Sequence, residues 1–279
     1  MSMNYKETRD RAGELAKALG ADREEMMDLA KLDFSVPSSK PRHRLLVSSE
    51  GVEKHGKTHF PLFTMPQPIG FIDFDLGTEG LVERAMQEGR MIIRKQFALR
   101  AKASLDGTKL THEQYKQEWQ QVRQVFHTLV KSPVIKSIVA DTGGEMWELC
   151  RLSYFGKLTK VMPHQYGEPK ADYDRLIRSP LIRDDLNALY THKVKAQYIN
   201  DKRTGKKERA GFADMSFAVQ CNIKHMKDVD THEFGVQVTD CRQNHEVDGE
   251  ELWGDMCNFP TLAMMVFPDS EPSDWGEEE

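Results

Sequence analysis

The sequence predicts an α/β fold with a mostly parallel central sheet flanked by helices. Short apolar segments alternate along the chain with longer segments whose apolar residues recur at helical spacing. One short segment, residues 136–141, is almost continuously apolar, as is typical of a parallel strand with both faces buried. A glycine-containing turn follows the first apolar segment, at residues 51–58. Because strands that alternate with helices pair in parallel, these patterns favour one large covered sheet.

The first 43 residues predict a small helical segment and a linker. Residues 5–32 place apolar side chains at mostly helical spacing, interrupted by Gly20, which indicates a helical hairpin. Residues 35–44 are rich in Pro, Ser and basic residues and have no period, which is typical of a linker. We therefore expect an N-terminal segment at 1–43, a core at 44–268, and an acidic, disordered tail at 269–279.

The core segments can be placed from their periodicity. Strands are predicted at residues 44–48, 69–74, 136–141, 186–192, 217–223 and 234–239. Helices are predicted at 79–103, at 111–130, around Met146, Trp147 and Leu149, and after a turn-rich loop at 156–170. The helix at 111–130 opens with a capping box, because Thr111 and Gln114 can each bond the other's backbone amide.

Composition narrows the possible functions. Lys and Arg number 39 against 44 Asp and Glu, a formal net charge of −5, so any nucleic-acid site has to be a local cluster of basic residues. The four cysteines are scattered without the spacing of a zinc site, which favours free thiols in a reducing compartment. No apolar run is long enough for a signal peptide or a membrane helix. We expect a cytoplasmic protein with no membrane partner.

Residues 51–58 read Gly-Val-Glu-Lys-His-Gly-Lys-Thr and satisfy the pattern G-x-x-x-x-G-K-[ST] directly after a predicted strand. In that context the loop amides wrap phosphates, Lys57 neutralises the β and γ oxygens, and the Thr58 hydroxyl ligates Mg²⁺. The alternative is a surface turn. We predict an MgATP site with nucleotide contacts from Gly51, Val52, Glu53, Lys54, His55, Gly56, Lys57, Thr58 and His59.

Such a site needs an acidic residue at the end of a neighbouring strand to hold the Mg²⁺ shell, and Asp141 ends the segment 136–141. The alternative role for Asp141 is an ordinary helix N-cap. Activation of water needs a second carboxylate, and the candidates are Asp75, Glu79 and Glu145. Each of the three could equally be a cap or a surface acid.

His192 ends the segment 186–192 and could report the state of the γ-phosphate, with a satisfied core histidine as the alternative. Two basic segments could contact nucleic acid, because basic side chains follow phosphates and an exposed aromatic ring can stack on a base. Solvated turns are the alternative. The residues concerned are Lys157, Lys160, His164, Tyr166 and Lys170 in the first segment, and Lys202, Arg203, Lys206, Lys207 and Arg209 in the second.

Several stretches carry a family resemblance. They are Ile-Val-Ala-Asp-Thr-Gly-Gly-Glu-Met-Trp-Glu-Leu at 138–149, Gly-Lys-Leu-Thr-Lys-Val-Met-Pro-His-Gln-Tyr-Gly at 156–167, Thr-His-Lys at 191–193, Asn-Asp-Lys-Arg-Thr-Gly at 200–205, Thr-Asp-Cys-Arg-Gln-Asn at 239–244 and Asn-Phe-Pro-Thr-Leu at 258–262. With the order of the motifs, they resemble RecA/Rad-type recombinases, and more closely the small phage RecA-like single-strand annealing ATPases of the Sak type. The resemblance covers about residues 44–268.

The resemblance implies a RecA-like P-loop NTPase core and assigns roles. It puts Asp75 at the catalytic carboxylate, where the family more often has glutamate, and His192 at a polar sensor between nucleotide and DNA. It puts residues 202–211 at the second DNA-binding loop and 157–170 near the first. Arg242 falls near positions from which recombinases reach into a neighbour's ATP, so a ring or filament of identical chains is implied.

We therefore predict an MgATPase that assembles on single-stranded DNA and promotes annealing or recombination in phage replication, in the cytoplasm of a bacterial host. A single-strand binding protein is a further expected partner. The alternative is a nucleotide-gated adaptor or loader of a replisome, in which the P-loop is a switch and the basic segments bind protein.

Overall fold

The computed structural model describes residues 5–32, 34, 36, 43–157, 161–199 and 202–276. Contacts between Cα atoms divide the chain into two units, Met1–Pro41 and Arg42–Glu279, close to the boundary expected at residue 43. Most of the expected linker, residues 35 and 37–42, lies outside the described part. Within that part no helix is both long and apolar enough to cross a membrane.

The first unit contains two helices where the sequence predicts a hairpin. They are α1 (Tyr5–Leu19) and α2 (Met27–Lys31). Ala12, Leu15 and Ala30 form their small shared core. Leu19, which follows the same apolar period, is 64% exposed, so the buried stripe of α1 ends before its last residue.

The second unit is built on one sheet with the strand order β3-β2-β4-β5-β1-β7-β8-β9, and β6 pairs with β5 alone. Pairing is parallel from β3 to β7 and antiparallel for β8, β9 and β6. The strands are β1 (Leu46–Gly51), β2 (Ile69–Asp73), β3 (Ile92–Gln96), β4 (Ser137–Asp141), β5 (Asn187–Ile199), β6 (Lys202–Arg209), β7 (Cys221–Lys227), β8 (Phe234–Cys241) and β9 (Glu251–Trp253).

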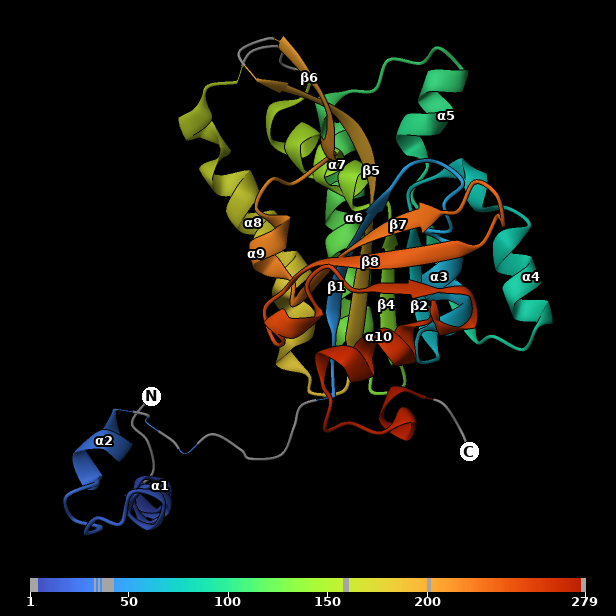
Figure 1. Ribbon diagram of the computed structural model, residues 1–279. Helices are drawn as coiled ribbons and strands as arrows, with labels where there is room; N and C mark the ends of the chain where they lie inside the picture. Colours follow the sequence, from blue (N-terminus) through green and yellow to red (C-terminus); the bar gives the residue numbers. More distant parts are fainter. Residues whose placement is uncertain are drawn as a thin grey trace. The chain divides into compact units, whose positions relative to one another are not determined.

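Helices cover both faces of this sheet (Figure 1). One face packs against α6 (His112–Lys131), α7 (Gly143–Phe155), α8 (Gly167–Arg178) and α9 (Met215–Ala218). The other packs against α3 (His59–Thr64), α4 (Leu81–Gln87) and α10 (Phe259–Val266). Adjacent residues of β4 enter the two opposite cores, Ile138 the first and Val139 the second, as the pleat of a strand requires. The predicted α/β fold with a mostly parallel, helix-flanked sheet is confirmed.

The capping box predicted at the start of the helix 111–130 is present. The Thr111 hydroxyl accepts from the Gln114 amide at 3.3 Å, and the Thr111 amide donates to Gln114 Oε1 at 2.8 Å. Both bonds satisfy amides that the first turn of α6 would otherwise leave without partners.

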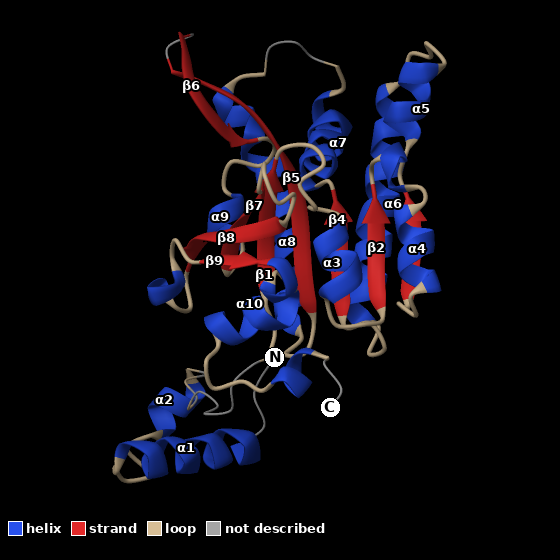
Figure 2. Ribbon diagram, turned by 45° about the vertical axis from the view of Figure 1, so that its right-hand side comes forward, coloured by secondary structure: helices blue, strands red, loops and turns tan. Residues whose placement is uncertain are grey.

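The single helix predicted at 79–103 is wrong. The segment contains α4, then the edge strand β3, then α5 (Leu99–Leu105), which stands beyond the strand ends (Figure 2). Gly89, with a φ of 87°, ends α4 in a conformation that favours glycine. Ile92 is 7% exposed and pairs with Ile69 of β2. The parallel edge of β2 therefore determines this strand, a long-range constraint that helical periodicity does not reveal.

Most of the segment 202–211 is a strand, β6, where a polar loop was expected. β5 continues seven residues past the predicted end at His192 to Ile199, and β6 returns antiparallel to it, with Gly205 at a φ of 78°. We call this projecting pair, residues 193–199 and 202–209, the arm (Figure 2). Polar composition favoured a loop, but a hairpin satisfies its own backbone groups without burying its side chains.

Residues 269–276 of the expected disordered tail are ordered. Pro272–Trp275 form a 3₁₀ turn, and Trp275 is 1% exposed against the core that contains Phe259. The Trp275 indole donates to Ser270 Oγ at 2.8 Å. One large aromatic side chain therefore anchors an otherwise acidic segment. Residues 277–279 lie outside the described part.

The expected loop at 156–170 is shorter than predicted. Where the structure describes it, Pro163–Tyr166 form a 3₁₀ turn, and α8 begins at Gly167. The strand predicted at 217–223 is shifted, because β7 begins at Cys221, where its register with Val47 of β1 starts. The strand predicted at 234–239 begins at Phe234 as expected and ends at Cys241.

Candidate functional site

The loop at 51–58 connects β1 to α3 and is held closely by the neighbouring strands. A side chain at Gly51 would meet His225 Cβ of β7 at 3.0 Å. Gly56 has a φ of 85°, and a side chain there would meet the Phe234 ring of β8 at 3.3 Å. The packing of the neighbouring strands therefore requires both glycines of the motif.

Lys57 is half-buried within this loop, and its ammonium group donates to the Val52 carbonyl at 2.5 Å. Burial lowers the pKa of Lys57, and Asp141 and Glu53 oppose that shift. His59, expected among the nucleotide contacts, instead stacks on Phe63 inside α3 with ring centroids 4.0 Å apart. The loop therefore presents backbone amides and one partly desolvated ammonium group.

Asp141 lies at the carboxyl end of β4 and meets the loop directly. The Thr58 hydroxyl donates to Asp141 Oδ2 at 2.6 Å, and Thr191 of β5 donates to Oδ1. Asp141 is 3% exposed, and burial raises its pKa against the effect of these two bonds. The N-cap of α7 is Thr142, whose hydroxyl accepts from the Glu145 amide at 3.2 Å. The structure thus gives the capping role to Thr142 and leaves Asp141 facing Thr58.

The three candidate carboxylates for water activation are placed differently. Asp75 follows β2, with a side chain 44% exposed, and its Oδ2 lies 3.8 Å from Lys193 Nζ. It also caps a short turn by accepting from the Gly77 amide at 3.1 Å. Glu145, in the first turn of α7, is paired with Arg100 at 2.6 Å. Glu79 is exposed and does not line the cavity that the other two share.

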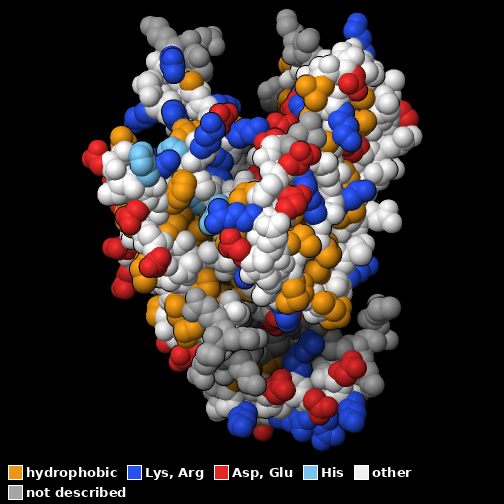
Figure 3. All heavy atoms as spheres, turned by 90° about the vertical axis from the view of Figure 1, so that its right-hand side faces the viewer, with side chains coloured by type: hydrophobic (Ala, Val, Ile, Leu, Met, Phe, Trp, Pro, Cys, Tyr) orange, Lys and Arg blue, Asp and Glu red, His pale blue; other side chains and the backbone are white. Residues whose placement is uncertain are grey.

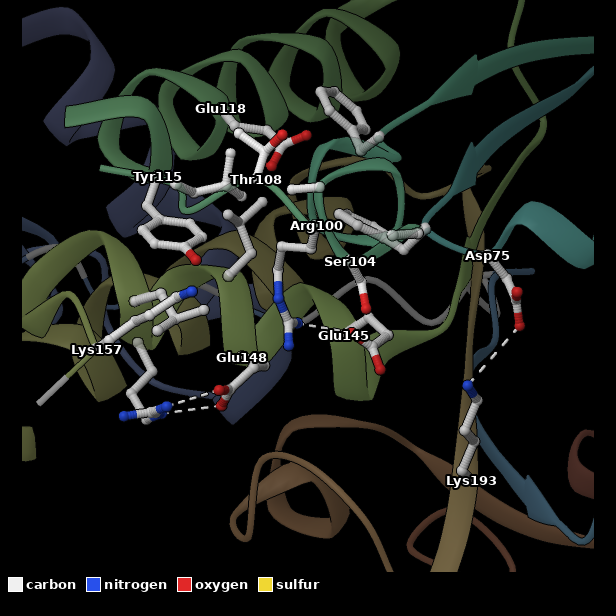
Figure 4. Close-up of a pocket in the computed structure, with 18 residues that line it drawn as sticks. Asp75, Arg100, Ser104, Thr108, Tyr115, Glu118, Glu145, Glu148, Lys157 and Lys193 are labelled. Atoms are coloured by element: carbon white, nitrogen blue, oxygen red, sulfur yellow. Dashed lines mark hydrogen bonds and ion pairs between the residues drawn. The ribbon is translucent and has the colours of Figure 1, made fainter. Parts of the chain in front are cut away.

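That cavity has a volume of about 590 Å³ and runs from the strand ends toward α5, α6 and α7. Figure 4 shows Asp75 and Lys193 on one side of it, the Arg100–Glu145 pair in the middle and Tyr115 on the far side. Charged residues line both ends of the cavity, with Glu118, Glu148 and Lys157 on the helical side. At the strand-end side the Asp75 side chain is 44% exposed. The cavity is therefore open to solvent water beside Asp75.

Asp73 was missed by sequence reasoning although it organises Asp75. It is fully buried at the end of β2, accepts from the Asp75 amide at 2.9 Å and from the Thr78 hydroxyl at 2.6 Å, and is paired with Arg94 of β3. The acidic doublet around Phe74 was the available signal, but the sequence does not tell which acid points inward. Asp73 fixes the backbone from which Asp75 projects.

His192 is fully buried where the arm leaves the sheet. Its Nδ1 lies 3.3 Å from the Ala210 carbonyl, and within the described part of the chain Nε2 has no hydrogen-bond partner. A side chain at Gly143 would come within 2.8 Å of its ring. Burial, and then the nearby Arg209, lower its pKa from 6.5 to about 3. The ring is therefore neutral and packed between β5, the start of α7 and the end of β6.

Arg209, expected to contact nucleic acid, is turned inward. Its guanidinium donates to Ser48 Oγ of β1 at 2.9 Å, to Asn222 Oδ1 of β7 at 3.1 Å and to Ser216 Oγ at 2.8 Å. These hydrogen bonds occupy donors that would otherwise be available to a phosphate. They also anchor the arm to β1, the strand that leads into the loop 51–58.

The other basic residues that were expected to contact nucleic acid lie on the arm, in the large cavity or in a surface ion pair. Arg203, Lys206 and Lys207 are exposed on the arm, whereas Lys160 and the side chain of Lys202 lie outside the described part. Lys157 lines the large cavity, and Lys170 is paired with Asp214 at 3.0 Å. On the face in Figure 3, Lys and Arg side chains gather around the hollow between two projections.

The other two aromatic and basic candidates make contacts within the chain. Tyr166 packs edge-on against Phe155 with ring centroids 5.3 Å apart and is half-buried. The exposed Arg242 donates to the Phe217 carbonyl at 2.8 Å.

The solved structures that are similar to this chain include a recombinase and an ATPase. The first is the crystal structure of the RadB recombinase, with a TM-score of 0.46 and 12% identity over 86% of this chain and 91% of that one. The second is an ATPase from the type III secretion system of pathogenic bacteria, with a TM-score of 0.42 and 8% identity over 67% of this chain and 52% of that one. No family model and no curated protein matches the chain. Function therefore rests on the residues of the site.

The residues that meet at the strand ends fit a magnesium nucleotide. Thr58 offers a hydroxyl oxygen and Asp141 a carboxylate 2.6 Å from it, which are oxygen ligands of the kind that Mg²⁺ takes alongside phosphates and waters. Lys57 lies within the same loop with only a carbonyl of that loop as its hydrogen-bond partner in the described structure. Bound there, Mg²⁺ would neutralise charge on the β and γ phosphate oxygens.

Proposed function

We propose that the protein is a RecA-like MgATPase that acts on single-stranded DNA. The observation that carries the proposal is the meeting of Thr58 and Asp141, 2.6 Å apart, at the carboxyl ends of parallel strands beside the glycine-flanked loop 51–58. Open α/β sheets bind their ligands at this edge. A surface turn that only happened to contain glycine and lysine would not be expected to place Thr58 against the buried carboxylate of Asp141.

In this proposal the loop amides and Lys57 bind the phosphates, and Thr58 and Asp141 orient the metal. Asp75 accepts a proton from the attacking water, which forms a bond to the γ-phosphorus while the bond to the β–γ bridging oxygen breaks and ADP leaves. Asp75 suits this role because it is partly exposed beside a cavity that water can enter. Glu145 is held by Arg100, so it is the second candidate.

The arm supports the nucleic-acid part of the proposal. It projects from the strand ends and carries exposed Arg203 and Lys206 on an otherwise acidic chain. Exposed basic groups on a two-stranded projection can follow a phosphate backbone without reading its bases. Annealing or recombination in phage replication, assembly into a ring or filament, and a role for Arg242 in a neighbour's site complete the proposal as the family resemblance implies it.

ATP hydrolysis measured with and without single-stranded DNA tests the proposal. We expect magnesium-dependent turnover that rises when DNA is added, and DNA binding that weakens steeply with salt. Nucleotide binding without any DNA binding at low salt would favour a nucleotide-gated adaptor or loader. Absence of nucleotide binding in a folded protein would refute both.

A further inference from the structure

The large cavity beside Asp75 has a helical side that the proposed hydrolysis of ATP does not use. Side chains of α5, α6, α7 and the segments between them form this side, and apolar ones such as Ala103, Leu110, Leu149 and Leu152 line it. The volume of about 590 Å³ falls within the range of small-molecule sites, about 300–1,000 Å³. In such sites a few polar groups among apolar walls orient the ligand. The polar groups on the helical side therefore indicate which ligand the cavity would take.

The first of these polar groups is the hydroxyl of Tyr115. This residue is 3% exposed and lines the cavity, yet its hydroxyl has no hydrogen-bond partner among the described residues. The hydroxyls of Tyr154, Tyr173 and Tyr190 differ, because each donates to a carboxylate or a backbone carbonyl of the chain. A hydroxyl that is withdrawn from bulk water costs free energy unless something bonds to it. The Tyr115 hydroxyl is therefore available to a ligand.

The second polar group is the carboxylate of Glu118, three residues after Tyr115 on α6, so the two side chains are neighbours on one helix face (Figure 4). Glu118 is 9% exposed, and its Oε1 accepts from the Leu99 amide at 3.3 Å. Its Oε2 has no hydrogen-bond partner in the described part of the chain. Burial raises the pKa of Glu118, against the effects of the Leu99 amide and Arg100. A ligand that donates to Oε2 would stabilise the charged form.

Apart from Glu118, Lys157 is the charged group of the cavity without an ion-pair partner among the described residues. It follows the end of α7 by two residues and is exposed. A ligand that satisfies both groups has hydrogen-bond donors at its buried end and negative charge at its outer end. The other charged side chains of the cavity form three ion pairs, Arg100–Glu145 at 2.6 Å, Arg151–Glu148 at 2.6 Å and Lys193–Asp75 at 3.8 Å.

A nucleotide unit has this arrangement of groups. Its flat base can pack against apolar and aromatic side chains, and its phosphate lies at the other end. An exocyclic amino group donates to a carboxylate, as cytosine does to glutamate. In cytosine and adenine a ring nitrogen that accepts a hydrogen bond lies beside the amino group, which matches the Tyr115 hydroxyl beside Glu118. Thymine has a carbonyl oxygen where cytosine has the amino group, and the carboxylate would repel it.

We propose that the helical side of this cavity binds a nucleobase that carries an exocyclic amino group, with the amino group on Glu118, the ring nitrogen on Tyr115 and the phosphate at Lys157. The base belongs either to a single strand or to a free nucleotide, since both present these groups. For a strand, the inference deepens the nucleic-acid part of the proposed function and rests on it. None of the residues 51–58 lines the cavity, so this site is separate from the proposed ATP site.

The test compares the affinity for cytosine with that for thymine. Titration calorimetry would measure deoxycytidine and thymidine monophosphate, and fluorescence anisotropy would measure labelled oligo(dC) and oligo(dT) of equal length, at pH 8 and one salt concentration. Cytosine is the probe because adenine nucleotides would also occupy the proposed ATP site. We expect wild type to prefer cytosine by about tenfold, the scale of one hydrogen bond to a charged group.

Glu118→Gln should abolish or reverse this preference. If the Leu99 amide keeps the glutamine oxygen, the amide nitrogen turns to the cavity, and this donor suits thymine. Tyr115→Phe should lower the affinity for cytosine without lowering the melting temperature, because the hydroxyl bonds to no described residue. Lys157→Ala should weaken the binding of both bases alike, since it removes only the phosphate contact.

Glu113→Gln is the matched control, because it makes the same change at an exposed position of α6 outside the cavity. It should keep the wild-type ratio of affinities. Equal affinities of wild type for the two bases, or a cytosine preference that survives in folded Glu118→Gln and Tyr115→Phe, would overturn the inference and leave DNA binding and ATP hydrolysis as proposed.

The two kinds of probe separate the two sources of the base. A cytosine preference in the oligonucleotides that both variants reduce would support the site and identify a strand as its ligand. The same preference in the monophosphates without binding of oligonucleotides would support the site with a free nucleotide, while the proposed action on DNA would fail. Binding of neither probe would overturn the inference, whatever the ATPase activity.

Discussion

The buried and exposed halves of the site differ in what holds their side chains. Asp141, Thr191 and His192 are at most 3% exposed and are hydrogen-bonded at the ends of neighbouring strands. Asp75 and Lys193 are about half exposed and share one ion pair at 3.8 Å, and Lys207 is exposed on the arm. A fixed half can hold charge in one place without reorganising, whereas an exposed half can rearrange when a ligand arrives. We therefore expect the buried side chains to determine how tightly the nucleotide binds, and the exposed side chains to rearrange when it binds.

Lys57→Ala is expected to have the largest effect, because the half-buried Lys57 supplies the positive charge that would contact the phosphates. ATP affinity should fall by about 1,000-fold, since several charge-assisted contacts disappear together. The fold should survive, because the ammonium group makes one hydrogen bond within its own loop. Fluorescent nucleotide binding and thermal melting would measure the two effects. Unchanged affinity in the folded variant would remove the basis of the nucleotide site.

Asp141→Asn should separate binding from turnover within the buried half. Asparagine keeps the shape but removes the charge that holds the metal shell, so we expect ATP affinity within a few-fold of wild type and hydrolysis reduced by about 100-fold or more. Because burial already raises the pKa of Asp141, the neutral side chain should not lower the melting temperature. Wild-type hydrolysis at saturating Mg²⁺ would contradict the metal assignment.

Asp75→Asn tests the exposed half. Loss of a general base typically costs about 10²-fold or more in turnover, and ATP binding should be spared because Asp75 does not line the phosphate loop. Steady-state hydrolysis of Asp75→Asn should be compared with Glu145→Gln and Glu79→Gln. A fully active Asp75→Asn beside an inactive Glu145→Gln or Glu79→Gln would move the base to the other carboxylate.

Protonation of two buried histidines should lower the free energy of unfolding in acid. Burial lowers the pKa of His192 and that of His225 from 6.5 to about 3. The stability that these neutral rings contribute is fully present above pH 6.5 and is lost as pH falls toward 3, because the unfolded chain binds protons that the folded chain does not. At pH 5 the loss is about 2 kcal/mol per histidine.

Urea unfolding of wild type and His192→Gln between pH 8 and pH 5 would measure this loss. His192→Gln removes one titrating ring, so its unfolding free energy should fall less steeply with acidification. Asp141 acts in the opposite direction, since burial raises its pKa. Equal slopes for the two proteins would show that His192 does not contribute to this loss.

The smallest effect is expected at the outer end of the arm. Arg203→Ala with Lys206→Ala should reduce the slope of log affinity for single strands against log salt by about 1.4, or about 0.7 for each lost phosphate contact. ATP affinity should be unchanged. Lys195→Ala, which breaks an exposed pair with Glu208, controls for general loss of charge on the arm. A wild-type slope in the double variant would make the arm a solvated hairpin and favour the adaptor reading.

The features that could be predicted from the sequence are those defined by residues close together along the chain. The loop 51–58, the strand that ends at Asp141 and the capping box at Thr111 are each defined by neighbours within a few residues, and the structure has all three in place. The α/β class followed from alternating periodicities, because these reflect which faces are buried. The edge strand β3 and the ordered turn around Trp275 were missed, because each depends on a partner distant in sequence.

Only the tertiary structure decided which of the chemically similar residues face the loop. Arg209 and Lys207 stand two residues apart in one basic segment, yet the first is bonded to β1 and β7 and the second lines a cavity with Val52 and Glu53. Asp73 and Asp75 are likewise equivalent in sequence, but one is fully buried and the other is open to solvent. Burial and partners depend on contacts between segments that are far apart along the chain, and composition carries no record of those contacts.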